Sequence, residues 1–363
     1  MMRIIFRGKR PSEEAGARFD NVAEQGTARG DKASSTLSKK SVMYATFLMA
    51  MAALSLPHQS PPSPSSSVAR VDSRPQSLHA AINTPVGNGW SMFSHQDFQK
   101  TTPNPHGFTC TYTPFKSSTG IEKDPDGATI EICVHPSNDG ISENVKKAGR
   151  FSHCDDLSQE WNERIPSKDS ASSSGQEEPI YVEIGANIGT CILEMLVGTN
   201  APIIAFEPNP MNYYAVRETM RKLHSSYQKR LLLFPVALGS EQGTNKIFTA
   251  EGNAGNSIVG KIIKDSPKQQ FDEKKQFDIY VERLDHILKP GPRIPLVKMD
   301  AQGYECEILK GMGADVAHTI ERVHFENAKK WLRAQNCLDL TQRFEEYGFR
   351  VTPQGGFNAI ASK

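Results

Sequence analysis

Four acidic side chains stand at the ends of short apolar runs, where they could do chemistry together. Glu183 is the next-to-last residue of the run at 180–184, and Glu207 directly follows the run at 202–206. Asp300 and Glu326 end the runs at 295–300 and 320–326. Short apolar runs rich in β-formers are typical of buried strands. Ala237 is the next-to-last residue of a further run at 231–238. Because ligands of open α/β sheets bind beyond the carboxyl ends of the strands, these five residues are predicted to meet in one crevice.

A glycine turn follows the first of these runs. Gly185 and Gly189 bracket it, and residues 190–197 then show apolar residues at helical spacing. Strand, glycine turn and helix open a nucleotide-binding α/β domain, because glycine allows a ligand to approach the backbone. A dinucleotide site requires G-x-G-x-x-G, but the second glycine position holds Asn187. This disfavours NAD and favours S-adenosylmethionine, which has no pyrophosphate.

The two acidic residues near this turn are each predicted to bind one part of S-adenosylmethionine, the methyl donor. Glu207 can accept hydrogen bonds from both ribose hydroxyls, and Glu183 suits the ammonium group. The residues predicted to bind the cofactor are Glu183, Gly185, Ala186, Asn187, Gly189, Glu207, Pro208, Ala237 and Asp300.

Four motifs in this order resemble the FkbM family of S-adenosylmethionine-dependent methyltransferases. They are VEIGANIG at 182–189, FEPNP at 206–210, PVALG at 235–239 and VKMDAQGYE at 297–305. The resemblance covers residues 178–363 and implies a Rossmann-like class I methyltransferase fold. Gln302 departs from the pattern, because many relatives carry Glu there. The family also implies a small N-terminal segment over the cofactor pocket.

The order of elements in 178–363 predicts the α/β architecture. Strands and helices alternate, so a mainly parallel, seven-stranded sheet is expected, closed by an antiparallel hairpin at 349–352 and 357–361. Residues 246–250 and 278–284 are predicted to form an insertion. The polar, glycine-containing segment 251–258 between them is expected to be either a loop beside the ligand or a plain exposed turn.

Methyl transfer requires mainly alignment of donor and acceptor, and a group that takes a proton. Asp300 is the first candidate, although it could instead cap the next helix. His324 and Glu326 share one face of their strand and are candidates for acceptor binding or general base. Glu305 could pair with Lys298. The sequence does not single out the base.

Residues 87–177 are predicted to form an accessory region, with strands at 108–112 and 129–134 and helices at 138–149 and 155–164. The six cysteines contain no C-x-x-C pair, so no metal site is predicted, although a divalent ion between Asp300 and Glu326 stays open. Cys191 and Cys306 are expected to be small buried apolar groups. Two of the accessory cysteines could pair if this part is lumenal.

The N-terminus is predicted to hold a membrane anchor. Residues 1–40 suggest a disordered cytoplasmic tail, and the uncharged run 41–56 a signal anchor behind Lys39 and Lys40. A cleaved signal peptide, a buried helix and a transit sequence are the alternatives. Residues 57–86 are predicted to be a Ser/Pro-rich stalk. This places the catalytic domain in the lumen of the Golgi or secretory pathway, with an organelle destination left open.

The function predicted from these features is O-methylation of a hydroxyl on a sugar, glycan or glycolipid. A non-catalytic, membrane-tethered binding module and an NAD-dependent oxidoreductase are the alternatives. The net charge is +1, and no basic run with interleaved aromatics appears in the folded part, so a nucleic-acid partner is not predicted.

Overall fold

The computed structural model describes residues 78–79, 81–83, 91–100, 104–136, 139–165, 178–250, 253–261 and 271–363. All described residues belong to one compact unit, Ala69–Lys363, which is the second of the two units of the chain. The predicted tail and anchor lie outside the described residues. Among helices within the described ranges, none is long and apolar enough to cross a lipid bilayer.

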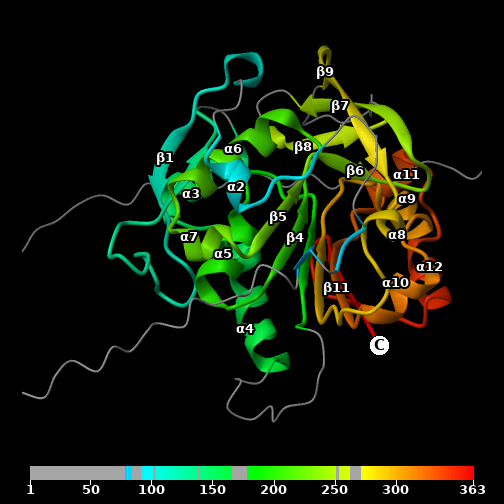
Figure 1. The fold of residues 1–363 in the computed structure, drawn as a ribbon. Coiled ribbons are helices and arrows are strands. Elements are labelled where there is room, and N and C mark those ends of the chain that lie inside the picture. Colours follow the sequence, from blue (N-terminus) through cyan, green and yellow to red (C-terminus); the bar gives the residue numbers. More distant parts are fainter. Residues whose placement is uncertain are drawn as a thin grey trace, which may run out of the picture. The chain divides into compact units, whose positions relative to one another are not determined.

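A seven-stranded sheet forms the centre of the second unit (Figure 1), in the order β12-β13-β11-β10-β3-β4-β5. Strands β3, β4, β5, β10 and β11 run parallel, and β12 and β13 close the edge as an antiparallel hairpin. The predicted α/β fold is confirmed. The strands are β3 (Tyr181–Ile184), β4 (Ile203–Phe206), β5 (Leu231–Phe234), β10 (Leu296–Met299), β11 (Arg322–Glu326), β12 (Arg350–Pro353) and β13 (Asn358–Ser362).

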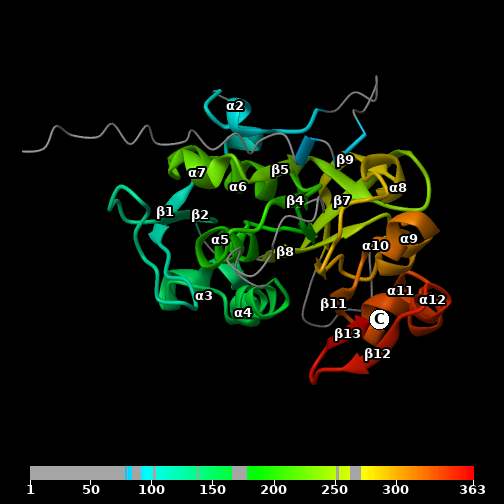
Figure 2. The ribbon, with the colours of Figure 1, turned by 60° about the horizontal axis from the view of Figure 1, so that its bottom comes forward.

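Helices cover both faces of this sheet (Figure 2), because side chains of a buried strand alternate between two apolar cores. Tyr181 contributes to one core and Val182 to the other. The first core contains α5 (Thr190–Gly198) and α6 (Pro210–Lys222), beside α7 (Ser225–Gln228). The second contains residues of α8 (Leu284–Ile287), α9 (Glu305–Lys310), α10 (Ala314–Thr319), α11 (Lys329–Ala334) and α12 (Leu340–Glu346). Helices α7, α8, α10 and α11 were not predicted.

A second sheet of four strands follows β5, in the order β6-β9-β7-β8. The prediction of one strand over 231–238 is wrong, because Pro235 cannot donate a backbone hydrogen bond and the chain changes sheets there. The segment predicted as a loop also contains a strand, β8. The bounds are β6 (Val236–Leu238), β7 (Gly243–Ala250), β8 (Asn253–Val259) and β9 (Phe271–Glu282).

The accessory region packs against α5 and α6 and is part of the same compact unit. Trp161 of α4 is buried in the same apolar core as Leu193 of α5. The two strands predicted in the accessory region pair antiparallel, and the two helices predicted there are present. The elements are α2 (His95–Phe98), η1 (Pro105–Gly107), β1 (Thr111–Pro114), β2 (Glu131–Val134), α3 (Gly140–Ala148), η2 (Ser152–Cys154) and α4 (Asp155–Arg164).

The predicted stalk extends too far toward the C-terminus. Leu78, Ala81 and Ile82 are buried in the core beside α8, and Ile82 bridges Leu288. These residues are apolar, unlike the Ser/Pro-rich part before them, and therefore belong to the folded unit.

All six cysteines form disulfides: Cys110–Cys133, Cys154–Cys191 and Cys306–Cys337. The prediction that Cys191 and Cys306 are plain buried apolar groups is therefore wrong. Both partners, Cys154 and Cys337, lie far away in the sequence, and cysteine connectivity cannot be deduced from sequence alone.

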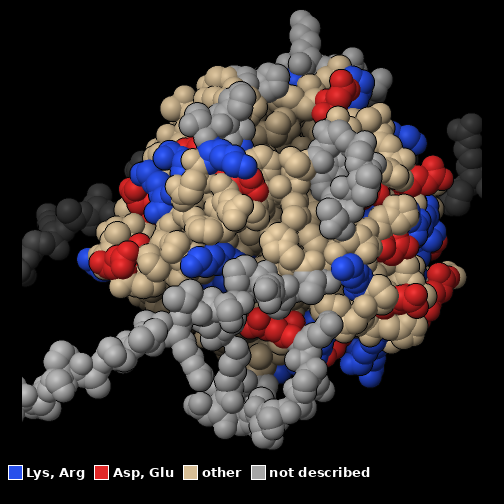
Figure 3. All heavy atoms as spheres, in the orientation of Figure 1, with Lys and Arg blue, Asp and Glu red and all other residues tan. Residues whose placement is uncertain are grey.

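The charged side chains of the described residues do not gather by sign on the face shown in Figure 3. Lys and Arg are interspersed with Asp and Glu. Many of them pair along helices, such as Lys146 with Glu143 at 2.7 Å and Arg343 with Asp339 at 2.6 Å.

Candidate active site

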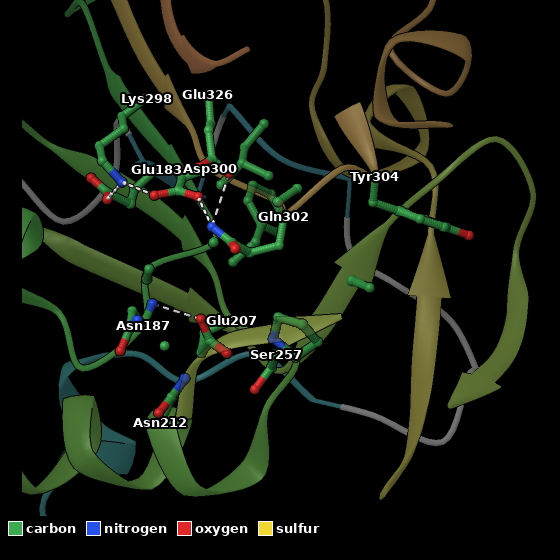
Figure 4. A pocket seen from close by; sticks show the side chains of 18 of the residues that line it. Glu183, Asn187, Glu207, Asn212, Ser257, Lys298, Asp300, Gln302, Tyr304 and Glu326 are labelled. Atoms are coloured by element: carbon green, nitrogen blue, oxygen red, sulfur yellow. Dashed lines mark hydrogen bonds and ion pairs between the residues drawn. The ribbon is translucent and has the colours of Figure 1, made fainter. Parts of the chain in front are cut away.

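A cavity lies beyond the carboxyl ends of β3, β4, β10 and β11 (Figure 4), with about 1140 Å³ of empty space that is partly open to solvent. The five strand tips predicted to converge all line it: Glu183, Glu207, Ala237, Asp300 and Glu326. Gly185, Ala186, Asn187 and Pro208 line it as well, but Gly189 does not. The topology therefore gathers nearly all the residues singled out from the sequence.

The glycine turn has a left-handed backbone at three positions, with φ of 80° at Gly185, 53° at Asn187 and 84° at Gly189. Gly185 is required by the protein itself, because a Cβ there would lie 2.0 Å from the carbonyl oxygen of Asp300. Gly189 faces Val216 of α6, whose methyl carbon would lie 3.0 Å from a Cβ. The glycines thus serve packing of the loop, and not only the approach of a ligand.

Glu207 is buried at the end of β4, with its carboxylate fixed by backbone groups. One oxygen accepts the N–H of Asn187 at 2.6 Å and the other accepts that of Asn209 at 2.8 Å. Burial raises the pKa of Glu207 to about 7, although these two hydrogen bonds oppose the rise. Each carboxylate oxygen can accept a further hydrogen bond. Two hydroxyl groups of a ligand in the cavity could therefore be held side by side.

Lys298 joins two of the acidic tips. Its ammonium lies 3.4 Å from Glu183 and 3.8 Å from Asp300, and it lines the cavity. Burial alone would lower the pKa of Lys298, but the two carboxylates outweigh it and raise the pKa. Glu305, the alternative partner considered from the sequence, instead accepts the N–H of Ala301 at 3.0 Å.

Gln302 links the two remaining acidic tips. Its side-chain amide donates to Asp300 at 2.7 Å and to Glu326 at 3.0 Å (Figure 4). Burial, reinforced by the charges of Asp300 and Glu305, raises the pKa of Glu326 to about 9. Glu326 is therefore protonated at neutral pH, and it cannot serve as a general base there until it loses that proton.

The structure does not bring His324 to the cavity. Its imidazole Nε2 lies 2.7 Å from Glu160 of α4, and Arg322 contacts the same carboxylate at 2.7 Å. His324 and Glu326 share a strand face as predicted, but only Glu326 reaches the end of the sheet that forms the cavity. The predicted joint action of this pair is therefore corrected: His324 connects the sheet to the accessory region.

Several residues that line the cavity were not predicted from the sequence. They come from elements that no strand pattern links to the tips: Ile141, Phe151 and His153 of the accessory region, Asn212 of α6, and Tyr304. Lys298 and Gln302 had a readable signal, because a charged residue inside an apolar run and an amide in place of a family glutamate are both unusual. Gly255, Asn256 and Ser257, in the segment expected beside the ligand, do line the cavity.

Comparison with known proteins identifies the domain that carries this cavity. Residues 183–351 match the model of the methyltransferase FkbM domain. This part of the chain is an FkbM methyltransferase domain. The resemblance found in the sequence motifs is thereby confirmed.

Two relatives of this FkbM domain are methyltransferases. Methyltransferase sdnD of Sordaria araneosa is 27% identical over 198 residues, which cover 48% of this chain and 74% of that protein. Hexuronic acid methyltransferase AglP of Haloferax volcanii is 26% identical over 141 residues, 38% of this chain. The match spans about half of AglP, 51%.

Solved methyltransferase structures also align with this chain, at low similarity. Methyltransferase FkbM from Methylobacillus flagellatus KT aligns over 53% of this chain and 46% of its own, with 17% identity and a TM-score of 0.36. Magnesium protoporphyrin IX methyltransferase (ChlM) from Synechocystis PCC 6803, with bound SAH, has 10% identity and a TM-score of 0.31, over 61% and 86% of the two chains.

Proposed function

We propose that this protein transfers the methyl group of S-adenosylmethionine to a hydroxyl oxygen of a sugar, glycan or glycolipid. The observation that carries the donor half is the position of Glu207. Its buried carboxylate ends the strand next to the glycine turn, and both oxygens are oriented by backbone N–H groups. Together with the strand arrangement, this supports a Rossmann-like class I methyltransferase fold.

The residues around the cavity fit this donor. Glu207 would hold the ribose hydroxyls, Glu183 would face the ammonium with Lys298 beside it, and Ala237 offers an apolar surface for the base. S-adenosylmethionine, when bound, supplies a methyl group already activated by its sulfonium. The contribution of the chain is then alignment of the acceptor oxygen and removal of its proton.

Asp300 is the proposed acceptor of that proton. Its side chain is 39% exposed, in contrast to Glu183 at 1%, so an acceptor entering the cavity can reach it. In methyl transfer the acceptor oxygen forms the new O–CH₃ bond while the S–CH₃ bond breaks. The hydroxyl proton passes to the Asp300 carboxylate.

An aromatic pair in the lining supports a carbohydrate acceptor. The rings of Phe151 and His153 lie 4.7 Å apart and are tilted by 37°. Aromatic rings combine a large apolar surface with a defined orientation, which suits the C–H faces of a sugar ring. The curated relative AglP is named for a hexuronic acid, which supports the same class of acceptor.

Three disulfides support a location in an oxidising compartment, because cytosolic proteins rarely keep them. This agrees with the secretory location proposed from residues 41–56, which would tether the protein to the membrane.

Isothermal titration with S-adenosylhomocysteine tests the donor half, with Glu345→Ala on the exposed side of α12 as a control for Glu207→Ala. Equal binding by the wild type and the control, and binding weaker by about 2–3 kcal/mol in Glu207→Ala, is the expected result. If the wild type gives no heat and no thermal shift at millimolar ligand, the proposal fails. The acceptor half is tested with methyl-labelled donor and a glycan extract.

A further inference from the structure

Gln302 has an unusual backbone conformation for its residue type. Its φ is 53°, and among described residues other than glycine only Asn187 and Asn336 share a positive φ. Asparagine adopts this left-handed region more readily than other residues, because its short side chain can hydrogen-bond to the local backbone. The longer side chain of glutamine lacks this advantage. Such strain persists where the surroundings determine the conformation, and it gathers at functional sites. Gln302 is also buried, with 9% exposure, while its side chain lines the cavity.

The conformation brings the amide between two strand ends. The amide nitrogen has two hydrogens, and it donates one to Asp300 at the end of β10 and the other to Glu326 of β11. With the amide turned over, its oxygen would face the Asp300 carboxylate, which has no hydrogen to donate, so that orientation is disfavoured. The oxygen Oε1 of Gln302 has no hydrogen-bond partner among the described residues. Both donors are therefore committed to the two acids.

We propose that Gln302 is a positioning residue for methyl transfer, which clamps Asp300 and Glu326 side by side and turns Asp300 toward the acceptor. This inference rests on the proposed function. The clamp leaves the second oxygen of Asp300, which faces Lys298 at 3.8 Å, for the acceptor hydroxyl. Glu326 supplies the other end of the clamp and does not itself act on the acceptor.

The protonation of Glu326 is consistent with these different roles of Asp300 and Glu326. Burial raises the pKa of Glu326 to about 9, the charges of Asp300 and Glu305 reinforce this rise, and the charge of Lys298 opposes it. Glu326 therefore holds a proton at neutral pH. A neutral amide can bridge a carboxylate and a carboxylic acid without adding a charge to the cavity.

Two substitutions separate the parts of this role. Gln302→Leu fills a similar volume but donates no hydrogen bond. Gln302→Glu keeps the shape but brings a third carboxyl group within reach of the other two, where like charges disfavour ionisation. Gln342→Leu is the matched control, because Gln342 is an exposed residue of α12 that donates to Glu346 at 3.2 Å.

The first experiment needs no activity. Carbon-13 NMR of labelled glutamate carboxyl groups should show one group that titrates near pH 9 in the wild type and is absent from Glu326→Gln. In Gln302→Leu the same group should titrate at higher pH, because the donor that stabilises its ionised form is gone. Gln342→Leu should leave it unchanged. Identical titration of Glu326 in wild type and Gln302→Leu would overturn the clamp.

The second experiment measures labelled methyl transfer into the glycan extract. Gln302→Leu and Gln302→Glu should lower kcat by about 10- to 100-fold, while the Kd for S-adenosylhomocysteine changes less than about threefold. Turnover within twofold of wild type would overturn the role, and so would a loss of donor affinity as large as the loss of kcat. Failure of the wild type to bind S-adenosylhomocysteine would instead sink the proposed function, and the NMR titration would still report on the clamp.

Discussion

The carbonyl oxygen of Asp300 occupies the space beside Gly185 that a Cβ would fill, 2.0 Å from the position of that atom. The backbone N–H of Asp300 also donates to the carbonyl of Ile184 at 2.9 Å. The glycine turn after β3 and the loop after β10 are therefore in direct backbone contact. Two motifs more than a hundred residues apart in the sequence are thus one structural unit.

Gly185→Ala should destabilise the protein severely. Neither backbone can yield without breaking the contact between β3 and β10, and φ of 80° is itself unfavourable for alanine. We expect a loss of about 3 kcal/mol or more in the free energy of unfolding, measured by urea denaturation. Gly243→Ala is the control, because a Cβ at Gly243 meets nothing within 4 Å. An unchanged urea midpoint for Gly185→Ala would contradict the contact.

Donor binding should depend on the ionisation of Glu207. Its pKa is raised to about 7, so the carboxylate that accepts the ribose hydroxyls is lost as the pH falls through 7. The affinity for S-adenosylhomocysteine should weaken from pH 8 to pH 6. Glu207→Ala should bind about 2–3 kcal/mol more weakly at pH 8 and show a flatter pH dependence. If titration calorimetry shows the same pH dependence of affinity in the wild type and in Glu207→Ala, Glu207 does not bind the donor.

Asp300 and His324 should differ sharply in their effects on turnover. Asp300→Asn keeps the volume and can still accept from Gln302, but it cannot take a proton, so kcat should fall about 100-fold or more. His324→Ala should leave kcat near wild type and lower the thermal midpoint, because it removes a contact to Glu160. Methyl transfer at saturating donor, together with thermal melts, checks both. The reverse pattern would return His324 to the catalytic candidates.

Stability should fall as the pH rises, in part because of Glu305. Burial raises its pKa from 4.5 to about 8, so the folded state holds a proton that the unfolded state has released. The contribution is complete below about pH 4.5 and is lost as the pH rises through 8. Glu305→Gln should reduce the decline in unfolding free energy between pH 5 and pH 8.5, whereas exposed Glu345→Gln should not. A decline of equal size in Glu305→Gln would assign the effect to other groups.

The strand tips could be predicted because they follow from simple patterns. Apolar runs mark buried strands, and a parallel sheet brings Glu183 and Asp300 to one edge whatever the loops do. Contacts made by side chains across that edge could not be predicted in the same way. The ion pair of Lys298 with Glu183 and the bridge of Gln302 depend on strand neighbours that are distant in the sequence.

The change of sheets at Pro235 and the cysteine pairing show the same limit. A proline inside an apolar run argues against a single continuous strand. Which strand each half of the run pairs with is decided by tertiary structure. Cys154 and Cys191 lie in the accessory region and in α5, and only the packed fold places them together. The reach of the accessory region over the cavity was expected from the family, but Phe151 and His153 carry no pattern that marks them.

The Cys154–Cys191 disulfide has a consequence for how the catalytic part can be inherited or moved between proteins. The matched domain begins at residue 183, so a gene fragment cut there would keep Cys191 and discard the cysteine that it bonds. It would also discard Trp161 and the buried residues Leu78 and Ile82. A fragment that begins at residue 183 therefore lacks part of the folded unit. Recombination that moves the methyltransferase domain to another protein would have to include the chain from about residue 78 onward.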